Sequence, residues 1–293
     1  MRVAITGATG FLGTALTGHL AVAGHDVIRI SRRPGPGTIV WDPDRQTIDT
    51  APLERCDAVI HLAGENLASG RWTTRRKAAL RASRVPVTAW LSSVLAQLAQ
   101  PPQLLITASA VGIYGDRGDD LLDESSPPGD DFLAHLAADW EGAADPARAA
   151  GIRVVHTRFG IILDSRGGAL AKMLPVFRLG IGGRLGSGRQ WMSWIALEDV
   201  VHAVAFIMQY TAIAGAVNVV SPEPVRNATF AHALGAAVHR PAIVPAPAFA
   251  LRLVLGEVAD AALLASQRAS PAVLQAHDYP YRVRSLPQAF AEI

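Results

Sequence analysis

The sequence predicts an α/β protein: a Rossmann-type, doubly wound parallel sheet with a smaller, mainly helical C-terminal lobe. Three observations predict this fold class. Short apolar runs alternate with helical stretches over the first 165 residues, a glycine-rich turn joins the first run to the first helix, and the texture of the chain changes after about residue 165. Alternation of this kind is typical of parallel strands joined by crossover helices.

Each predicted element of the first 165 residues has its own signal. Short runs rich in Val and Ile predict buried strands, and helical spacing of apolar residues predicts the helices between them. The strands are RVAIT (2–6), DVIRI (26–30), DAVIHLA (57–63), QLLITAS (103–109) and RVVHTRF (153–159), with TIVWDP (38–43) as a further candidate. The helices are expected near 12–23, 73–82, 84–99 and 132–149.

The chain beyond residue 165 is organised differently. Residues 165–190 are glycine-rich and irregular, which suits either a loop that closes over a ligand or a plain surface excursion. Helical spacing returns at 196–209 and GAVNVV follows as a strand, so residues 196–220 are expected to return to the first domain. Residues 166–195 and 221–293 are then the substrate-side loop and the C-terminal lobe.

The composition is that of a globular protein and excludes several functional classes. Half of the 293 residues are hydrophobic, and the formal net charge of +2 gives no strong field for a polyanion. The densest basic cluster, 71–84, has helical periodicity and only one aromatic residue, Trp72, so it predicts a solvated helix face and not a nucleic-acid interface. A lone Cys56 excludes an internal disulfide and a cysteine-rich zinc site, and no metal is predicted.

We expect the chain to be soluble and cytoplasmic, without a membrane partner. MRVAITG at the start lacks a signal-peptide layout. Residues 200–222 contain no formally charged residue, but His202, Asn218 and the break around Gly215 argue against a membrane helix. A buried helix followed by a strand fits this stretch better.

The glycine-rich turn, TGATGFLG (6–13), lies between the first strand and the first helix. Its three glycines permit a tight turn, close approach of the backbone to a pyrophosphate, and tight packing of helix on strand. The helix then offers free N–H donors to phosphate groups. Residues 1–165 are therefore expected to be a dinucleotide-binding Rossmann domain, with cofactor contacts from Gly7, Thr9, Gly10, Phe11, Leu12 and Gly13.

The end of the second strand predicts which dinucleotide is bound. A site selective for NAD(H) would place Asp or Glu there for the ribose 2′-hydroxyl, and Asp26 comes too early in the strand. Ser31, Arg32 and Arg33 instead offer a hydroxyl and two guanidinium groups, which suit a 2′-phosphate. NADP(H) is therefore preferred over NAD(H); the alternative is that both arginines are solvated loop residues.

TGATGFLG, HLAG (61–64) and SAVGIYG (109–115) resemble the extended short-chain dehydrogenase/reductase superfamily. Residues 64–85, 127–141 and 244–268 resemble one atypical branch, the NAD-dependent epimerase/dehydratase-like "epimerase family protein" group, which ends in a C-terminal region of unassigned function. The superfamily often pairs through helices, so a homodimer is compatible with the resemblance. It also implies that Ser109 orients a substrate oxygen, and that the cofactor lies beside His61, Leu62, Ala63, Gly64 and Ala108.

The superfamily's catalytic signature, a Tyr followed four residues later by a Lys, is missing. None of the four tyrosines has a lysine four residues after it. When the chain is aligned on Glu141, Leu133 and Ala137 stand where the pair would be expected. In the superfamily the lysine lowers the pKa of the tyrosine, which then exchanges a proton with the substrate. This chain therefore lacks the usual proton path.

Five polar residues are candidates for the substrate side, and all but Asn66 have a structural alternative. Ser109 is the catalytic candidate, and it would otherwise cap the following turn. Glu65 and Asn66 follow HLAG, and Glu65 would act as acid or base if burial raised its pKa, or else form a cap or ion pair. Tyr114 is either a substrate contact or a packed ring. Arg158 would hold an anionic substrate or form a structural ion pair.

Two hypotheses follow. In the first, the protein is an NADP(H)-dependent oxidoreductase, or an epimerase that oxidises and re-reduces an unknown small molecule with a non-standard proton donor. In the second, it is a non-catalytic NADP(H)-binding or redox-sensing module. The missing pair favours the second hypothesis, whereas Ser109 and the glycine-rich loop favour the first, because proximity and orientation alone assist hydride transfer. The first is preferred.

Overall fold

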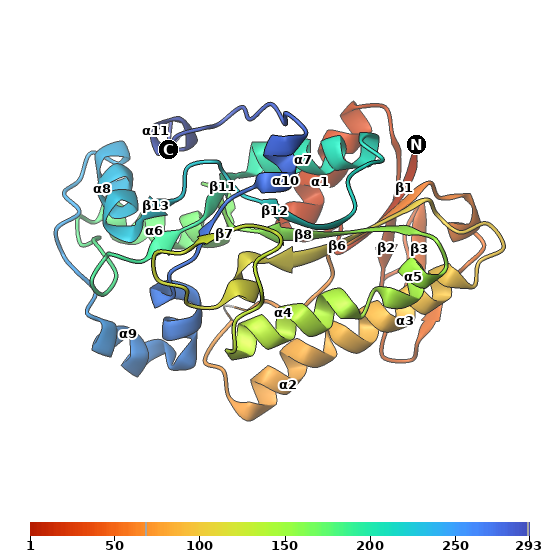
Figure 1. The fold of residues 1–293 in the computed structure, drawn as a ribbon, viewed down its shortest axis with the longest axis horizontal. Helices are drawn as coiled ribbons and strands as arrows, with labels where there is room; N and C mark the ends of the chain where they lie inside the picture. The colour runs from red at the N-terminus through yellow and green to blue at the C-terminus, as the bar shows by residue number, and fades with distance from the viewer. Residues whose placement is uncertain (68, 292) are drawn as a thin grey trace.

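The structure, a computed structural model, describes residues 1–67, 69–291 and 293. Its centre is an eight-stranded sheet in the order β12-β8-β6-β5-β1-β2-β3-β4, parallel except where β4 joins β3 (Figure 1). The strands are β1 (Arg2–Thr6), β2 (Asp26–Ser31), β3 (Thr38–Asp42), β4 (Thr47–Ile48), β5 (Ala58–His61), β6 (Leu104–Ala110), β8 (Arg153–Phe159) and β12 (Gly215–Val219). The predicted fold class is confirmed.

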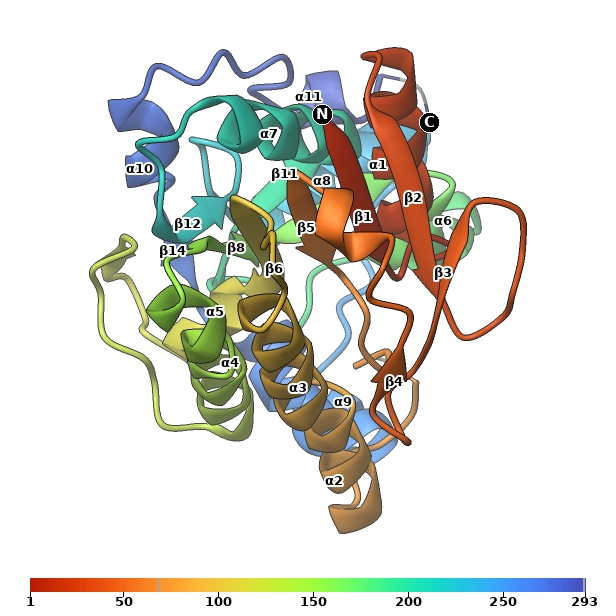
Figure 2. The ribbon, with the colours of Figure 1, turned by 90° about the vertical axis from the view of Figure 1, so that its right-hand side faces the viewer.

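Helices cover both faces of the sheet (Figure 2). Because successive side chains of a strand point to opposite faces, each strand supplies two apolar layers. Val3 and Ile5 belong to the layer beneath α1 and α7, whereas Ala4 belongs to the layer beneath α3 and α5. The helices of this domain are α1 (Phe11–Val22), α2 (Thr74–Ala82), α3 (Val85–Ala96), α4 (Phe132–Gly142), α5 (Asp145–Ala149) and α7 (Leu197–Gln209).

Two segments differ from the sequence prediction. The stretch 132–149 forms two helices, because Pro146 lacks the N–H that would continue α4 and instead lies in the first turn of α5. The stretch 165–190, expected to be irregular, contains α6 (Gly168–Arg178). Leu170, Leu174 and Phe177 of α6 have helical spacing and are all buried.

The chain beyond β12 is mainly helical and is joined to earlier parts of the chain by two of three small two-stranded sheets. No helix in the described part of the chain is long and apolar enough to cross a bilayer. The short pairs are β7 (Leu121–Leu122) with β14 (Arg268–Ala269), β9 (Ile161–Asp164) with β11 (Trp194–Ala196), and β10 (Trp191–Met192) with β13 (Val225–Arg226). The helices beyond β12 are α8 (Asn227–Ala237), α9 (Ala248–Leu255), α10 (Ala272–Ala276) and α11 (Leu286–Ala289), with a π-helix at Ala259–Leu264. Two 3₁₀ turns, Leu53–Arg55 and Val111–Tyr114, lie in the first part of the chain.

The C-terminal region packs directly on α2 and α4. An apolar group that we call the junction cluster joins them, and Lys77 Nζ of α2 lies 2.7 Å from the Glu257 carboxylate. Arg71 Nε donates to the carbonyl of Val254 at the end of α9. The buried members of the junction cluster are Trp72, Leu80, Leu136, Val258 and Ala261.

Candidate functional site

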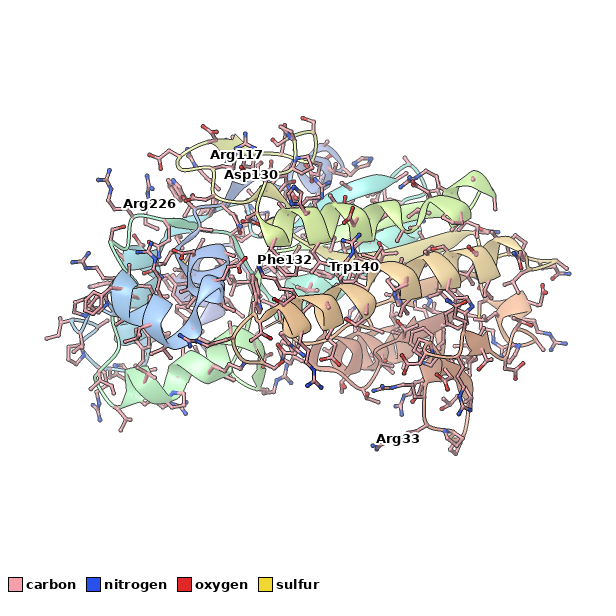
Figure 3. The ribbon with its side chains drawn as sticks, turned by 90° about the horizontal axis from the view of Figure 1, so that it is seen from below. Arg33, Arg117, Asp130, Phe132, Trp140 and Arg226 are labelled. Atoms are coloured by element: carbon pink, nitrogen blue, oxygen red, sulfur yellow. The ribbon has the colours of Figure 1, made fainter. Side chains whose placement is uncertain are left out.

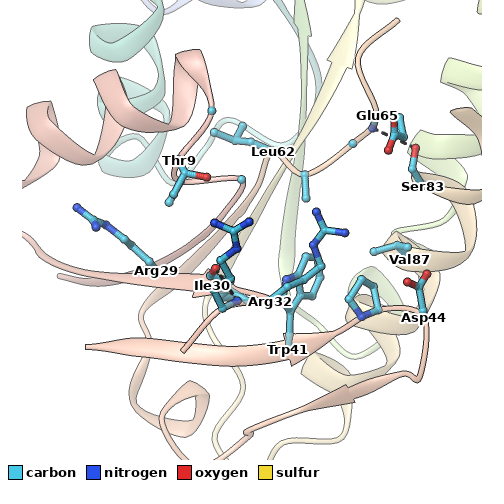
Figure 4. Close-up of a pocket in the computed structure, with 18 of the residues that line it drawn as sticks. Thr9, Arg29, Ile30, Arg32, Trp41, Asp44, Leu62, Glu65, Ser83 and Val87 are labelled. Atoms are coloured by element: carbon cyan, nitrogen blue, oxygen red, sulfur yellow. Dashed lines mark hydrogen bonds between the residues drawn. The ribbon is translucent and has the colours of Figure 1, made fainter. Parts of the chain in front are cut away.

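A cavity of about 1190 Å³ opens at the carboxyl edge of β1, β2, β3 and β5 (Figure 4). Ligands of open parallel sheets bind at this edge, because the loops that follow the strands converge there. The residues predicted as cofactor contacts that line the cavity are Gly7, Thr9, Gly10, Ser31, Arg32, Arg33, Leu62, Ala63 and Gly64. The predicted contacts outside this lining are Phe11, Leu12, Gly13, His61 and Ala108.

The glycine turn has the geometry that a pyrophosphate site requires. Gly7 has a φ of 67°, a backbone conformation that favours glycine. A Cβ at Gly13 would lie 2.1 Å from the Gly7 carbonyl oxygen, so only glycine lets α1 pack this closely on the turn. Gly10, at the start of α1, has no side-chain cap, which leaves N–H groups of the first turn for a ligand.

The end of β2 presents cationic and hydroxyl groups to the cavity. Arg29, Ser31, Arg32 and Arg33 all line it, and the backbone N–H of Arg33 donates to Ser31 Oγ at 3.1 Å. Figure 3 shows Arg33 at the outer edge of the molecule. The lining includes two carboxylates: Asp44, which follows β3, and Glu65, whose Oε2 accepts from Arg76 at 3.0 Å. Because three guanidinium groups line the cavity and one of the two carboxylates is paired with Arg76, this end of the cavity suits a phosphate better than a free ribose hydroxyl.

His61 lies beneath the cavity lining and contacts Thr6 and Thr88. Its side chain is fully buried, and its ring nitrogens lie 2.7 Å from Thr6 Oγ1 and 3.0 Å from Thr88 Oγ1. Burial, followed by the charge of Arg84, lowers the pKa of His61 to about 4. Thr6 Oγ1 also accepts from the backbone N–H groups of Leu62 and Ala63. The His61 side chain therefore holds the HLAG turn and does not line the cavity.

Ser109 belongs to a closed network of polar side chains. Its hydroxyl is buried and donates to Glu141 Oε1 of α4 at 2.6 Å. Because Ser109 pairs with Arg158 in the β6–β8 register, both side chains leave the same face of the sheet. Arg158 donates to both oxygens of Glu141 at 2.8 Å. Burial opposes ionisation of Glu141, but Arg158 outweighs it and holds the pKa of that carboxyl below its usual range.

Tyr114 belongs to the same network. Its ring is fully buried, and its hydroxyl donates to Asn218 Oδ1 at 2.7 Å and accepts from Arg158 Nη1 at 3.0 Å. Burial raises the pKa of Tyr114, so the phenol is held neutral. Neither Tyr114 nor Arg158 lines the cavity. Tyr114 is a packed ring and Arg158 forms an ion pair with Glu141, which are the structural alternatives that the sequence left open for these two residues. Asn66 is exposed and follows Glu65, two residues after the end of HLAG.

The two positions expected for the Tyr–Lys pair are filled by apolar packing. Leu133 packs on the junction cluster, which includes Trp72 and Leu136 (α4 with Phe132 is seen in Figure 3). Ala137 is buried beside Val111 and Tyr114. An acid–base group would therefore be enclosed by apolar side chains at position 137 and would border them at position 133, which is half-buried.

Several lining residues were missed by the sequence analysis. Arg29 precedes Ser31 by two positions, so strand alternation could have placed both on one face. The basic stretch 71–84 was interpreted as a solvated helix face, yet its last turn faces the cavity, and Ser83 Oγ accepts from the N–H of Glu65 at 3.1 Å. The remaining lining residues that were not predicted are Ala8, Ile30, Trp41, Pro43, Asp44, Ala79, Ala82 and Val87.

Known proteins are similar to this chain over nearly its whole length. Residues 3–219 match the NAD dependent epimerase/dehydratase family, and residues 246–293 match a domain of unknown function, DUF1731. The chain is 43% identical over 289 residues to the epimerase family protein Mb2239 of Mycobacterium bovis, covering 98% of this chain and 95% of the relative.

Two solved structures are similar in both fold and sequence. The crystal structure of human epimerase family protein SDR39U1 (isoform 2) with NADPH has a TM-score of 0.90 and 36% identity, covering 100% of this chain and 99% of that one. The nucleoside-diphosphate sugar epimerase of Corynebacterium glutamicum has a TM-score of 0.83 and 38% identity, covering 99% of this chain and 57% of that one.

Proposed function

Because this chain belongs to the NAD-dependent epimerase/dehydratase family, in the atypical epimerase family protein branch with a DUF1731 domain, we propose that it is an NADP(H)-dependent oxidoreductase or epimerase of a small molecule. The observation that carries the proposal is the cavity that joins the glycine turn to Ser31, Arg32 and Arg33. The human relative with 36% identity was solved with NADPH, which supports the choice of cofactor.

The residues present fit this cofactor. The Gly7–Gly13 turn leaves room that a Cβ would fill, and the uncapped start of α1 supplies N–H donors for the pyrophosphate. Ser31, Arg29 and Arg32 supply a hydroxyl and guanidinium groups for the 2′-phosphate. When bound, the nicotinamide gives or takes a hydride.

The first test is a titration of the protein with NADPH and NADH in parallel, followed by tryptophan fluorescence. Trp41 lines the cavity and provides the signal. We expect tight binding of NADPH and weak binding of NADH. Equal affinities would contradict the assignment of the β2 end to a 2′-phosphate, and failure to bind either would remove the main support for the proposal.

A non-catalytic NADP(H)-binding module is the second candidate. It is favoured by the engagement of Ser109 with Glu141 and by the apolar packing of Leu133 and Ala137. A screen of carbonyl compounds that follows oxidation of NADPH separates the two functions. Turnover that falls in Ser109→Ala, with NADPH binding retained, supports the enzyme; binding without turnover of any carbonyl supports the module.

A further inference from the structure

One end of the molecule exposes a set of large apolar side chains. They lie on three segments: the chain just after α6, the chain before α9, and α9 itself, at the left of Figure 1. Their side chains are between 55% and 77% exposed. We call this set the apolar face, and its members are Leu179, Ile181, Ile243, Phe249, Leu253 and Val254.

The segments of the apolar face are joined by backbone hydrogen bonds. The N–H of Val244 donates to Gly182 O at 3.2 Å, and the N–H of Ala246 donates to Arg184 O at 2.9 Å. The chain then enters α9 directly after Pro247. None of the residues of α9 is fully buried, although Arg71 fixes the end of the helix through the carbonyl of Val254. These hydrogen bonds fix the segments that carry the exposed apolar side chains.

The unpaired charges on these segments are cationic, because the adjoining carboxylates of Glu257 and Asp260 form ion pairs with Lys77 and Arg252. Residues 165–186 and 224–256 contain no Asp or Glu. Within the described residues, four cations of these segments have no carboxylate partner, and Arg240 Nε donates to the carbonyl of Arg178 beside the apolar face. These four are Lys172, Arg178, Arg184 and Arg240.

The apolar side chains and the cations of this face indicate which partner binds it: a second copy of the chain, a nucleic acid or a bilayer. A twofold contact with a second copy would bring the same cations together, which is unfavourable. A nucleic acid would match the cations but not Leu179, Ile181 and Ile243, which cannot stack on bases. A helix that projects hydrophobic side chains between cations fits a bilayer surface, where hydrocarbon lies beneath anionic head groups.

We propose that the apolar face binds peripherally to bilayers that contain anionic lipid. Phe249, Leu253 and Val254 of α9 enter the level of the head groups, and Arg178 and Arg240 contact lipid phosphates. The sequence predicts no membrane partner, because none of its segments is suited to span a bilayer. Peripheral binding needs no such segment, and it is independent of the proposed function.

The test is flotation of the purified full chain with vesicles of phosphatidylcholine, alone or mixed with phosphatidylglycerol. We expect binding to the mixed vesicles only, weakened by salt because exposed charges are screened. The double variant Phe249→Ser/Leu253→Ser should bind about tenfold more weakly or worse, since two apolar anchors are lost. Arg178→Glu/Arg240→Glu should lose binding to the mixed vesicles as well.

Leu121→Ser is the matched control, because Leu121 is 62% exposed but lies on β7, outside the apolar face. It should bind as the parent chain does, and thermal unfolding should show that every variant is folded. No binding to mixed vesicles, or equal binding to neutral ones, overturns the proposal. So does sedimentation that shows a dimer abolished by Phe249→Ser/Leu253→Ser, which would assign the apolar face to a second copy.

Discussion

The hydroxyl of Ser109 donates to Glu141 across the space between β6 and α4, and the same carboxylate accepts two hydrogen bonds from Arg158. The catalytic candidate Ser109 is therefore coupled to a buried ion pair. Both charged side chains are close to 10% exposed, at 9% and 11%. Removal of either partner would leave the other charge with little water around it.

Replacement of Glu141 should therefore be costly. We expect Glu141→Leu to lower the free energy of unfolding by about 3–5 kcal/mol, because Arg158 keeps its charge without a partner. Urea unfolding measures the change. Asp139→Leu on the same helix is the control: its ion pair with Arg81 is about half exposed and should contribute less than about 1 kcal/mol. Equal losses in the two variants would contradict the role given to the buried pair.

Cofactor preference should depend on Arg32. We expect Arg32→Ala to weaken NADPH binding about tenfold or more, since a hydrogen bond to a charged group contributes about 1.5–3 kcal/mol. NADH binding should not change, because NADH has no 2′-phosphate. Fluorescence titration with both dinucleotides checks this. Arg55→Ala, an exposed arginine outside the cavity, is the control, and parallel losses for NADPH and NADH would rule out a phosphate contact.

Two glycines of α1 should respond in opposite directions to the same substitution. The Cβ of Gly13→Ala would meet the Gly7 carbonyl and the Ala8 Cα, so we expect a loss of stability of about 1–3 kcal/mol and much weaker NADPH binding. Gly18→Ala has nothing within 4 Å of its Cβ and should stabilise the helix by about 0.5–1 kcal/mol. Unfolding curves and titration together decide; a neutral Gly13→Ala would refute the close packing.

Stability should fall in mild acid because two buried histidines are held neutral. Burial is the main cause that lowers the pKa of both His61 and His156 to about 4, whereas the unfolded chain titrates near 6.5. A lowered pKa in the folded state stabilises the protein above pH 6.5, and this contribution is lost as the pH falls from there towards 4. The full loss, reached below the pKa of the folded state, is about 3 kcal/mol for each histidine.

Urea unfolding of the parent chain and of His61→Gln, at about pH 7 and about pH 5, measures this dependence. The variant should lose less stability between the two pH values than the parent does, because one of the two groups no longer titrates. An identical loss in both proteins would show that His61 is not responsible.

The parts of the site that are local in sequence could be predicted, and the parts that depend on packing could not. The signals of the glycine turn and the SRRP stretch lie within a few residues, so the local sequence predicts Gly7 and Arg32 as cofactor contacts, and both line the cavity. His61 was expected beside the cofactor because it belongs to HLAG. Its orientation away from the cavity depends on Thr6 and Thr88, which are distant in the chain.

Partners of the polar side chains were the least predictable feature. Glu141 served only as a position for alignment, because nothing local shows that α4 aims it at Ser109 and Arg158. The helix α6 was missed for the opposite reason. The glycines around it predicted a loop, whereas apolar residues at helical spacing decided the structure.

The junction cluster gives the missing tyrosine a structural explanation. Leu133 stands at the aligned tyrosine position and packs on this cluster, which Val258 and Ala261 enter from the C-terminal domain. A tyrosine there would place a polar hydroxyl against this apolar group, which would weaken the contact between α4 and the C-terminal region. At this position the side chain serves the attachment of the C-terminal region and not proton transfer, so introducing a tyrosine would require repacking of the residues that hold that region in place.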